Sequence, residues 1–222
     1  MAVSAVLFSP FAILSGVLPI LPRMRFIGWW AQFITFWLRV TCKIHHKVQG
    51  LEHLTTSPAV ILSKHQSAWE TIAFQVIFPP QTWALKREAL WTPFFGWGLA
   101  ATRPIAINRA TRIRALDQLL EQGGERLAEG RWVVIFPEGT RVAPGVQGRY
   151  TPGGAMLAVR TGTPVIPVAH NAGLFWGRRR FIKHPGTIQV SIGPAIQTQG
   201  RKPRVVNQEA EEWIENKMAA LL

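Results

Sequence analysis

The sequence has little cysteine and little negative charge. Cys42 is the one cysteine among 222 residues, which excludes an intrachain disulfide and a cysteine-rich zinc site. A reducing, cytosol-facing environment fits this composition. Twelve acidic residues stand against 25 Lys and Arg, so the formal net charge is +13 at pH 7. A chain this basic is attracted to anionic partners, and nucleic acid and the phosphates of a membrane surface are the main candidates.

Internal repeats and low-complexity tracts are also missing, and a hydrophobic content of 48% is enough for a folded core. Ten Trp residues favour the membrane as the partner, because Trp is enriched where lipid meets water. A nucleic-acid-binding protein would need aromatic residues interleaved with Lys and Arg on one face, whereas most Trp here lie in apolar runs. We therefore expect no nucleic-acid partner.

Charged residues are absent from Met1 to Pro22, a length that approaches the roughly 20 apolar residues of a membrane-spanning helix. Pro10 and Pro19 interrupt the segment, since proline removes a backbone hydrogen bond and clashes with the preceding turn. The segment is therefore interpreted either as a membrane-spanning helix or as a kinked segment that lies at shallow depth in the membrane. The next apolar run, Phe26 to Leu38, is too short to span and rich in Trp, which is typical of a helix in the headgroup region.

We predict that residues 1–43 form a helical membrane anchor and that residues 44–222 form the folded domain. The alternative for Phe26 to Leu38 is a core helix of a soluble fold. After Lys43, short apolar runs alternate with longer amphipathic stretches, which predicts an α/β domain. The predicted strands are Ala59–Ser63, Trp132–Phe136, Pro164–Ala169 and Thr187–Gly193. The predicted helices are Ala68–Phe78, Thr111–Glu129, Pro152–Thr161 and Val206–Leu222.

Polar residues cluster directly after three of these strands, in the segments "SKHQSAWE", "PEGTR" and "HNAG". That edge is where open α/β sheets bind ligands. Within the first segment, Ser67 and Glu70 fit a capping box, which would satisfy free amides at a helix start. Alternatively, His65 is a general base whose ring is oriented by the Glu70 carboxylate.

The segment "FPEGTR", Phe136 to Arg141, combines a turn, a hydroxyl, exposed amides and a guanidinium after a buried strand. This set suits a phosphate monoester, which arginine binds in bidentate fashion. An ordinary strand-to-loop turn with a surface ion pair is the alternative. His45, His46 and His53 lack the spacing and the partners of a metal site, so we expect no metal.

The motifs "HQSAWE", "FPEGTR" and "VIPVAHNAG", in this order, resemble the membrane-bound glycerolipid acyltransferase family, in particular its bacterial 1-acyl-sn-glycerol-3-phosphate acyltransferases. The resemblance extends roughly from Gly50 to Pro194. One position departs from the family pattern, because Glu70 stands where the usual residue is Asp. Glutamate keeps the negative charge and adds one methylene, so the departure affects the geometry and not the chemical role.

The resemblance implies a mixed, largely parallel central sheet flanked by helices, with residues 44–222 as the catalytic domain. It implies His65 as the base and Glu70 as its orienting partner. The residues it places at the glycerol-phosphate site are Glu138, Gly139, Thr140 and Arg141. The segment "GLAATRPIAINR" resembles a further block of the family, in which Arg109 would be another phosphate ligand, and Pro167 would shape the acyl-binding region or lie in a plain buried strand.

The implied activity is transfer of an acyl group from a thioester of acyl carrier protein or coenzyme A to the sn-2 hydroxyl of lysophosphatidate, without a cofactor. The implied location is the inner membrane, with the catalytic domain facing the cytoplasm. Another lysolipid acceptor, such as a lyso-ornithine lipid, and a non-catalytic lipid-binding protein are alternatives. The run Arg178, Arg179, Arg180 and Lys183 could engage the membrane, either substrate or acyl carrier protein, all of which are anionic.

Overall fold

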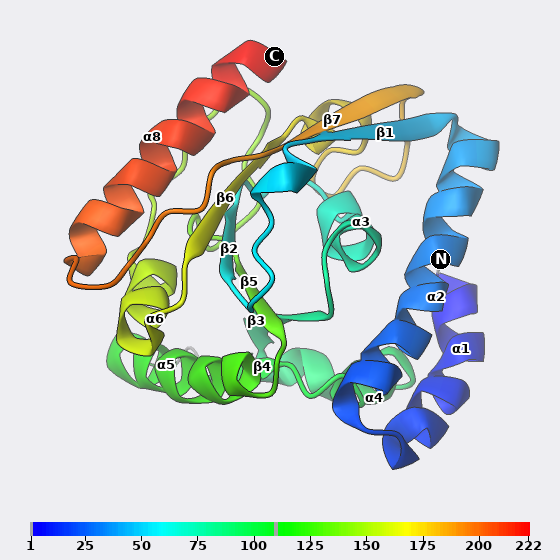
Figure 1. Cartoon of the computed structure of the whole chain (residues 1–222). Coiled ribbons are helices and arrows are strands. Elements are labelled where there is room, and N and C mark those ends of the chain that lie inside the picture. The colour runs from blue at the N-terminus through cyan, green and yellow to red at the C-terminus, as the bar shows by residue number, and fades with distance from the viewer. Residues whose placement is uncertain (1, 109–110) are drawn as a thin grey trace.

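The fold is known from a computed structural model, which describes residues 2–108 and 111–222. Its centre is a seven-stranded sheet with the strand order β1-β7-β6-β2-β5-β3-β4 (Figure 1). Five neighbouring pairs are parallel, and β6 and β7 are antiparallel. The predicted α/β fold with a mixed, largely parallel sheet is therefore confirmed.

The strands are β1 (Ile44–Gln49), β2 (Val60–Ser63), β3 (Gln81–Lys86), β4 (Ile105–Ile107), β5 (Trp132–Ile135), β6 (Val165–His170) and β7 (Gly186–Ile192). The four predicted strands match β2, β5, β6 and β7 to within one residue at each end. Sequence analysis missed β1, β3 and β4. The first lies at an edge of the sheet and exposes most of its side chains, and the last has only 3 residues, so neither shows a clear apolar run.

The helices are α1 (Ala2–Leu14), α2 (Ile20–Cys42), α3 (Trp69–Ile77), α4 (Phe95–Ala100), α5 (Arg112–Ala128), α6 (Gly153–Thr161), α7 (Ala172–Phe175) and α8 (Pro203–Leu221). Short 3-10 turns cover Ser15–Val17, Leu51–His53 and Arg87–Trp91. The last helix begins three residues before the predicted Val206, because Pro203 fits the first helical turn, where a missing amide hydrogen costs nothing.

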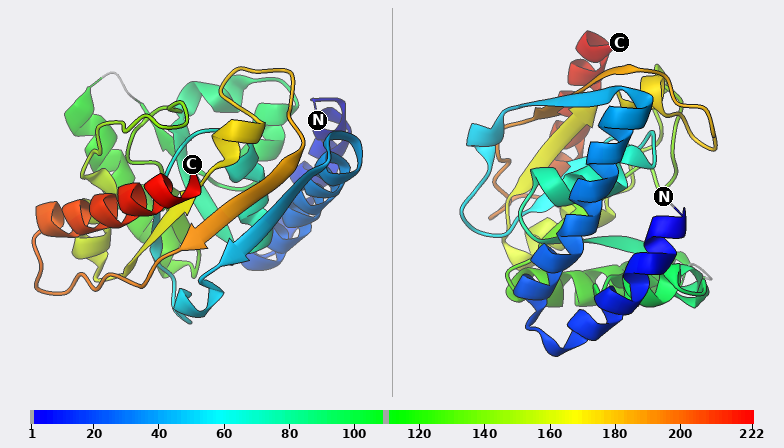
Figure 2. Two further views of the ribbon diagram at one scale, coloured as in Figure 1. Left: turned by 90° about the horizontal axis from the view of Figure 1, so that it is seen from above. Right: turned by 90° about the vertical axis from the view of Figure 1, so that its right-hand side faces the viewer.

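Helices cover both faces of the sheet (Figures 1 and 2). Alternate residues of one strand point to opposite faces, so Ile61 of β2 packs with α2 and α3, whereas Val60 and Leu62 pack with α5, α6 and α8. The two hydrophobic clusters that result leave the ends of the strands as the place where polar groups gather.

Residues 2–42 contain two helices, α1 and α2, that pack on this body through α4 and α3. One face of α2, which includes Ala31 and Leu38, is buried in the same cluster as the sheet, so the core-helix alternative holds for that face. The other face exposes Trp29, Phe33 and Trp37. Among the described residues, no helix is both long enough and apolar enough to span a bilayer. The anchor remains a prediction.

Candidate active site

Three polar segments meet at one edge of the sheet. The strands β6, β2 and β5 are parallel neighbours, so their carboxyl ends lie side by side. Directly after them come Lys64 and His65, Phe136 to Glu138, and Asn171. Backbone bonds connect the segments, since the amide of Val142 donates to the carbonyl of His65 at 2.8 Å. The expected ligand-binding edge is thus formed by the motifs that sequence analysis identified.

His65 and Glu70 lie in direct contact. The distance between Nδ1 of His65 and Oε1 of Glu70 is 2.8 Å. A carboxylate only accepts hydrogen bonds, so Nδ1 carries the proton and donates it, which leaves Nε2 as the acceptor. The ring of His65 stacks on that of Phe136, with the centroids 3.9 Å apart and an interplanar angle of 15°. The imidazole is therefore fixed in tautomer and orientation.

Glu70 also serves the start of α3. Its Oε1 accepts hydrogen bonds from the backbone amides of Gln66 and Ser67 at 2.9 and 2.8 Å. The hydroxyl of Ser67 accepts from the amide of Trp69 at 3.1 Å, one residue earlier than a standard capping box would place it. One carboxylate oxygen thus contacts both the amides at the start of α3 and the ring of His65, so the capping and orienting contacts coexist. The role of His65 as a general base stays a prediction.

Glu70 remains ionised although it is fully buried. Burial by itself raises the pKa of this carboxyl, but the nearby His170, the hydrogen bond from His65 and the amide of Ser67 together lower the pKa below its ordinary value. His170 is itself buried, and burial lowers the pKa of its imidazole. We therefore assign the ionised state of Glu70 chiefly to its three donors and not to a charge on His170.

A neutral His170 supports the loop that carries His65. Its Nδ1 accepts from the amide of Ala172 at 3.3 Å, so Nε2 carries the proton and donates to the carbonyl of Lys64 at 2.9 Å. The segment "HNAG" indicates polar groups at this edge of the sheet, but its local pattern predicts no role for His170. The signal available was its position directly after a strand, at the same edge as His65.

Lys64 forms a buried ionic cluster that sequence analysis missed. Its Nζ lies 2.8 Å from Oε1 of Glu138 and 2.8 Å from Oε1 of Glu215 on α8, and it donates to the carbonyl of Val146 at 3.0 Å. Tyr150 donates to the same oxygen of Glu215 at 2.8 Å, and burial together with this carboxylate raises the pKa of its phenol. All three ammonium hydrogens are used, so the lysine is a structural cation.

Glu138 is predicted at the glycerol-phosphate site, and in the structure both of its carboxylate oxygens already have partners. Its Oε2 accepts from the amide of His65 at 3.0 Å, and its Oε1 binds Lys64 and the amide of Gly148. A buried carboxylate with both oxygens bonded would repel a phosphate rather than bind it. Direct phosphate binding by Glu138 is not the role that this geometry supports, because the residue holds the backbone at His65.

The remaining residues of the "FPEGTR" motif, Gly139 to Arg141, are less buried than Glu138. Gly139 has a positive φ of 66°, in the left-handed region that favours glycine, and Gly139 and Thr140 are both exposed. Arg141 is half-buried and lines a cavity together with His65. Arg109 lies outside the described residues. Pro167 lies in the buried strand β6 and is not among the residues that line this cavity, so the plain-strand interpretation applies to it.

The cavity beside His65 has a volume of about 430 Å³. Its walls come from α1, α2, α3, β3 and α4, and most of the side chains are apolar, among them Ile27, Trp30, Ile72 and Leu99. Hydroxyl groups in the wall are already bonded to the backbone, as Ser9 donates to the carbonyl of Phe94 at 2.5 Å. The space is thus an apolar pocket with His65 and Arg141 as its ionisable groups.

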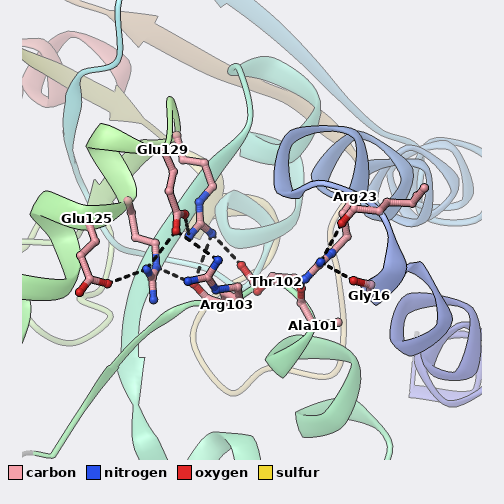
Figure 3. Close-up of polar contacts among 10 residues, drawn as sticks. Gly16, Arg23, Ala101, Thr102, Arg103, Glu125 and Glu129 are labelled. Carbon is pink, nitrogen blue, oxygen red and sulfur yellow. Dashed lines mark hydrogen bonds and ion pairs between the residues drawn. The ribbon is translucent and has the colours of Figure 1, made fainter.

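Arginines brace the elements that form this pocket. Arg23 at the start of α2 donates to the carbonyls of Gly16 at 2.6 Å and Ala101 at 3.2 Å, which ties the α1–α2 turn to the end of α4 (Figure 3). The carbonyl of Thr102, a lining residue, accepts from the buried Arg131 at 2.7 Å. These bonds satisfy carbonyls that the end of α4 leaves free, and they hold the pocket wall in place.

A metal centre was not expected. Within residues 2–108 and 111–222, no group of three His, Cys, Asp or Glu side chains could hold a metal ion. The absence of a cofactor stays a prediction.

Comparison with known proteins places the chain in a family. The Acyltransferase family model matches residues 45–171. The chain is 48% identical over 212 residues to the 1-acyl-sn-glycerol-3-phosphate acyltransferase of Pseudomonas aeruginosa, which covers 94% of this chain and 82% of that protein. It is 29% identical to the mouse 1-acyl-sn-glycerol-3-phosphate acyltransferase alpha over 72% of this chain, and it spans 58% of the mouse protein.

A solved structure has the same fold. The crystal structure of the 1-acyl-sn-glycerophosphate (LPA) acyltransferase PlsC from Thermotoga maritima matches 99% of this chain and 90% of its own, with a TM-score of 0.81 and 21% sequence identity. The family model covers more than half of this chain and includes both the His65 and the "FPEGTR" motifs. The protein therefore belongs to the acyltransferase family.

Proposed function

We propose that this protein transfers a fatty acyl group from an acyl thioester to the sn-2 hydroxyl of 1-acyl-sn-glycerol-3-phosphate, forming phosphatidic acid. One observation carries the proposal: the His65 ring, held by Glu70, borders an apolar cavity that Arg141 also lines. A base, a cation and an apolar volume are what acyl transfer to a phosphorylated lipid alcohol needs. The names of the similar proteins support the same activity.

The chemical step uses the free nitrogen of His65. Nε2 takes the proton of the sn-2 hydroxyl as its oxygen attacks the thioester carbonyl carbon. The new C–O bond forms, the C–S bond breaks, and the leaving sulfur receives the proton from the imidazolium. The Glu70 carboxylate stabilises that cation while it exists, because it is bonded to Nδ1 at 2.8 Å. Much of the acceleration comes from holding both substrates beside one base.

Arg141 is the proposed ligand of the acceptor phosphate, since this residue lines the cavity together with His65 and a guanidinium binds phosphate in bidentate fashion. The exposed Gly139 and Thr140 are proposed to border the phosphate, with the Thr140 hydroxyl as the donor, because the amide of Gly139 already donates to the carbonyl of Phe136 at 3.0 Å. Arg109 is proposed as a second cationic ligand. Glu138 acts indirectly, through the amide of His65. Binding the phosphate away from the reacting bond aligns the hydroxyl with the base.

The apolar cavity is the proposed site of an acyl chain, because apolar walls and few free polar groups suit a hydrocarbon. The donor is an acyl thioester of acyl carrier protein or of coenzyme A, and the proposed reaction uses no metal or cofactor.

We further propose that residues 1–43 attach the protein to the inner membrane, with the catalytic domain, residues 44–222, facing the cytoplasm. On α1, Val3, Leu7 and Leu14 are exposed and recur at helical spacing, and the outer face of α2 carries exposed Trp and Phe. Such faces suit helices that lie in the bilayer interface. Retention of the protein in the membrane fraction after a salt wash, and its release by detergent, would support this attachment; recovery in the soluble fraction would contradict it.

The activity is tested with the purified chain in detergent micelles. Lysophosphatidate and a lyso-ornithine lipid are offered as acceptors, each with acyl carrier protein and coenzyme A thioesters in separate reactions. We expect phosphatidate as the main product, and an Arg141→Gln variant should raise KM for lysophosphatidate about tenfold or more. Arg149→Gln, at an exposed position outside the cavity, is the matched control. Exclusive use of the other acceptor, or lipid binding without turnover, would contradict the proposal.

A further inference from the structure

The segment between α7 and β7, Gly177–Pro185, carries two adjacent apolar side chains in water. We call it the α7–β7 loop. Phe181 is 92% exposed and Ile182 is 70% exposed. Four cations share the loop, namely Arg178, Arg179, Arg180 and Lys183. Isolated exposed apolar residues are ordinary on protein surfaces, but a large apolar pair within a cationic run combines the two forces that hold a segment in an anionic bilayer interface.

The loop is held in shape by its own bonds. The indole of Trp176 donates to the carbonyl of Arg180 at 3.2 Å, and the Lys183 ammonium donates to the carbonyl of Phe181 at 3.1 Å. The same ammonium lies 4.5 Å from the centroid of the Trp176 ring. The projection of Phe181 and Ile182 is therefore part of the folded structure, and a binding partner would need to order little backbone.

The α7–β7 loop is continuous with the exposed face of α2. A surface hollow is lined on one side by Thr41–Lys43, at the end of α2, and on the other by Phe181–Lys183 and Pro185. Both views of Figure 2 show the loop beside this end of α2. One turn earlier, Trp37 and Val40 are exposed on the helix. The apolar surface of the N-terminal helices thus extends onto a loop that is more than 130 residues away in the sequence.

The loop also borders the candidate active site. Arg178 donates from Nη1 to the carbonyl of Arg141 at 3.1 Å, and Arg141 lines the cavity with His65. A surface in contact with this loop is therefore also close to the proposed phosphate ligand.

We propose that the α7–β7 loop is a second contact with an anionic lipid bilayer, in addition to the N-terminal helices. Phe181 and Ile182 enter the apolar layer, while Arg179, Arg180 and Lys183 bind headgroup phosphates. The inference rests on the membrane setting of the proposed function. A bilayer fits better than an acidic protein, because the two exposed apolar side chains join the Trp-rich face of α2 and not an isolated basic patch.

A fluorescent probe at the loop tests the contact directly. In a Cys42→Ala background, an environment-sensitive thiol dye is attached to Ile182→Cys or to the control Leu51→Cys, a position that is 50% exposed. The turn that contains Leu51 and the α7–β7 loop lie on opposite sides of the molecule in the right view of Figure 2. With the full chain on phosphatidylcholine vesicles containing phosphatidylglycerol, we expect the dye at 182 to shift to the blue and to be quenched by lipid-borne nitroxide. The dye at 51 should stay accessible to aqueous iodide.

Charge variants test the headgroup contribution. Arg179→Gln with Arg180→Gln should lower partition onto vesicles with phosphatidylglycerol about tenfold to thirtyfold, because each cation near an anionic bilayer strengthens partition about fivefold. Partition of the same variant onto pure phosphatidylcholine should stay unchanged. Lys202→Gln with Arg204→Gln, an exposed pair at the start of α8, removes the same charge elsewhere and should change partition less than about threefold.

The proposal is overturned if the dyes at 182 and 51 respond alike on vesicles that bind the protein. It is also overturned if the dye at 182 responds to acyl carrier protein but not to vesicles, since the loop would then dock a protein. Acyl transfer by the same variants in micelles is measured separately. Lack of turnover by the unlabelled wild type would contradict the proposed function. The dye measurements would still decide whether the α7–β7 loop contacts the bilayer.

Discussion

The two ends of the candidate site are built in different ways. Around His65, the loops after β2 and β5 are joined to each other and to α3 and α8 by hydrogen bonds and ion pairs of 2.8 to 3.0 Å, through Glu70, Glu138 and Lys64. The cavity beside it is formed by apolar side chains from five elements, and its outer helices are exposed to solvent on their far faces. Proton transfer needs fixed directions, whereas a hydrocarbon chain needs only volume, so a change should act on chemistry at one end and on chain selection at the other.

At the polar end of the site, we expect substitution of Lys64 to cause the largest loss of stability. Lys64→Met leaves the Glu138 carboxylate buried without its cation, and we expect a loss of about 3–5 kcal/mol in the free energy of unfolding. Denaturant titration measures this loss. The double variant Lys64→Met with Glu138→Gln removes both charges and should recover part of the stability. A single variant as stable as the wild type would show that the cluster does not hold the loop.

Glu70→Gln separates the orienting charge from the helix cap. The amide oxygen still accepts from Gln66 and Ser67, but a neutral side chain does not stabilise the imidazolium, so kcat should fall about 10²-fold with little change in KM. The matched variant Ser67→Ala loses a cap bond and about 1 kcal/mol of stability, and it should keep kcat within a few-fold. Steady-state kinetics of both variants measure the two kcat values. Equal losses of kcat would contradict the separation of the orienting charge from the helix cap.

The buried His170 predicts a loss of stability in mild acid. Burial lowers the pKa of its imidazole, against the attraction of Glu70, so the folded protein binds this proton less tightly than the unfolded chain does. Stability is complete above the unfolded value of 6.5 and falls as pH decreases toward the folded value. One such group gives a slope of up to about 1.4 kcal/mol per pH unit. Unfolding titrations over this range measure it.

The His170→Gln variant is the control, because it lacks the titrating ring. Its free energy of unfolding should depend less steeply on pH than that of the wild type. His46, whose pKa is also lowered by burial, contributes in the same direction and remains in both proteins. The lowered pKa of Glu70 acts only in more acidic solution, below its ordinary value of 4.5. An identical slope with and without His170 would exclude this residue as the source.

The apolar end should respond with a smaller effect on selectivity. Ala5 of α1 lines the cavity, whereas its neighbour Val6 is 40% exposed and does not. Ala5→Phe fills part of the cavity and should lower kcat/KM for long-chain relative to short-chain thioesters by about tenfold. Val6→Phe adds the same ring outside. Competition assays between chain lengths measure the ratio, and an equal change in both variants would refute the assignment of the cavity to the chain.

The same difference explains what could be predicted from the sequence. His65 and Glu70 are five residues apart after a clearly apolar strand, so their contact follows from local pattern. Glu215 contacts Lys64 across 151 residues, and no local pattern indicates that pair. The cavity was not predictable for the same reason, because its walls come from separate elements and α1 contributes ordinary Ala and Ser side chains to it. Strands β1, β3 and β4 were missed because their burial is partial or their length is short.

The most direct test of the central claim is the rate of phosphatidate formation by His65→Ala beside the wild type, in micelles with lysophosphatidate and an acyl thioester. Removing the base should lower kcat by about 10²-fold to 10⁴-fold, while a denaturant titration shows that the variant is folded. We expect the wild type to form phosphatidate and a folded His65→Ala protein to form almost none. Turnover at the wild-type rate in the folded variant would contradict the role of His65 as the base.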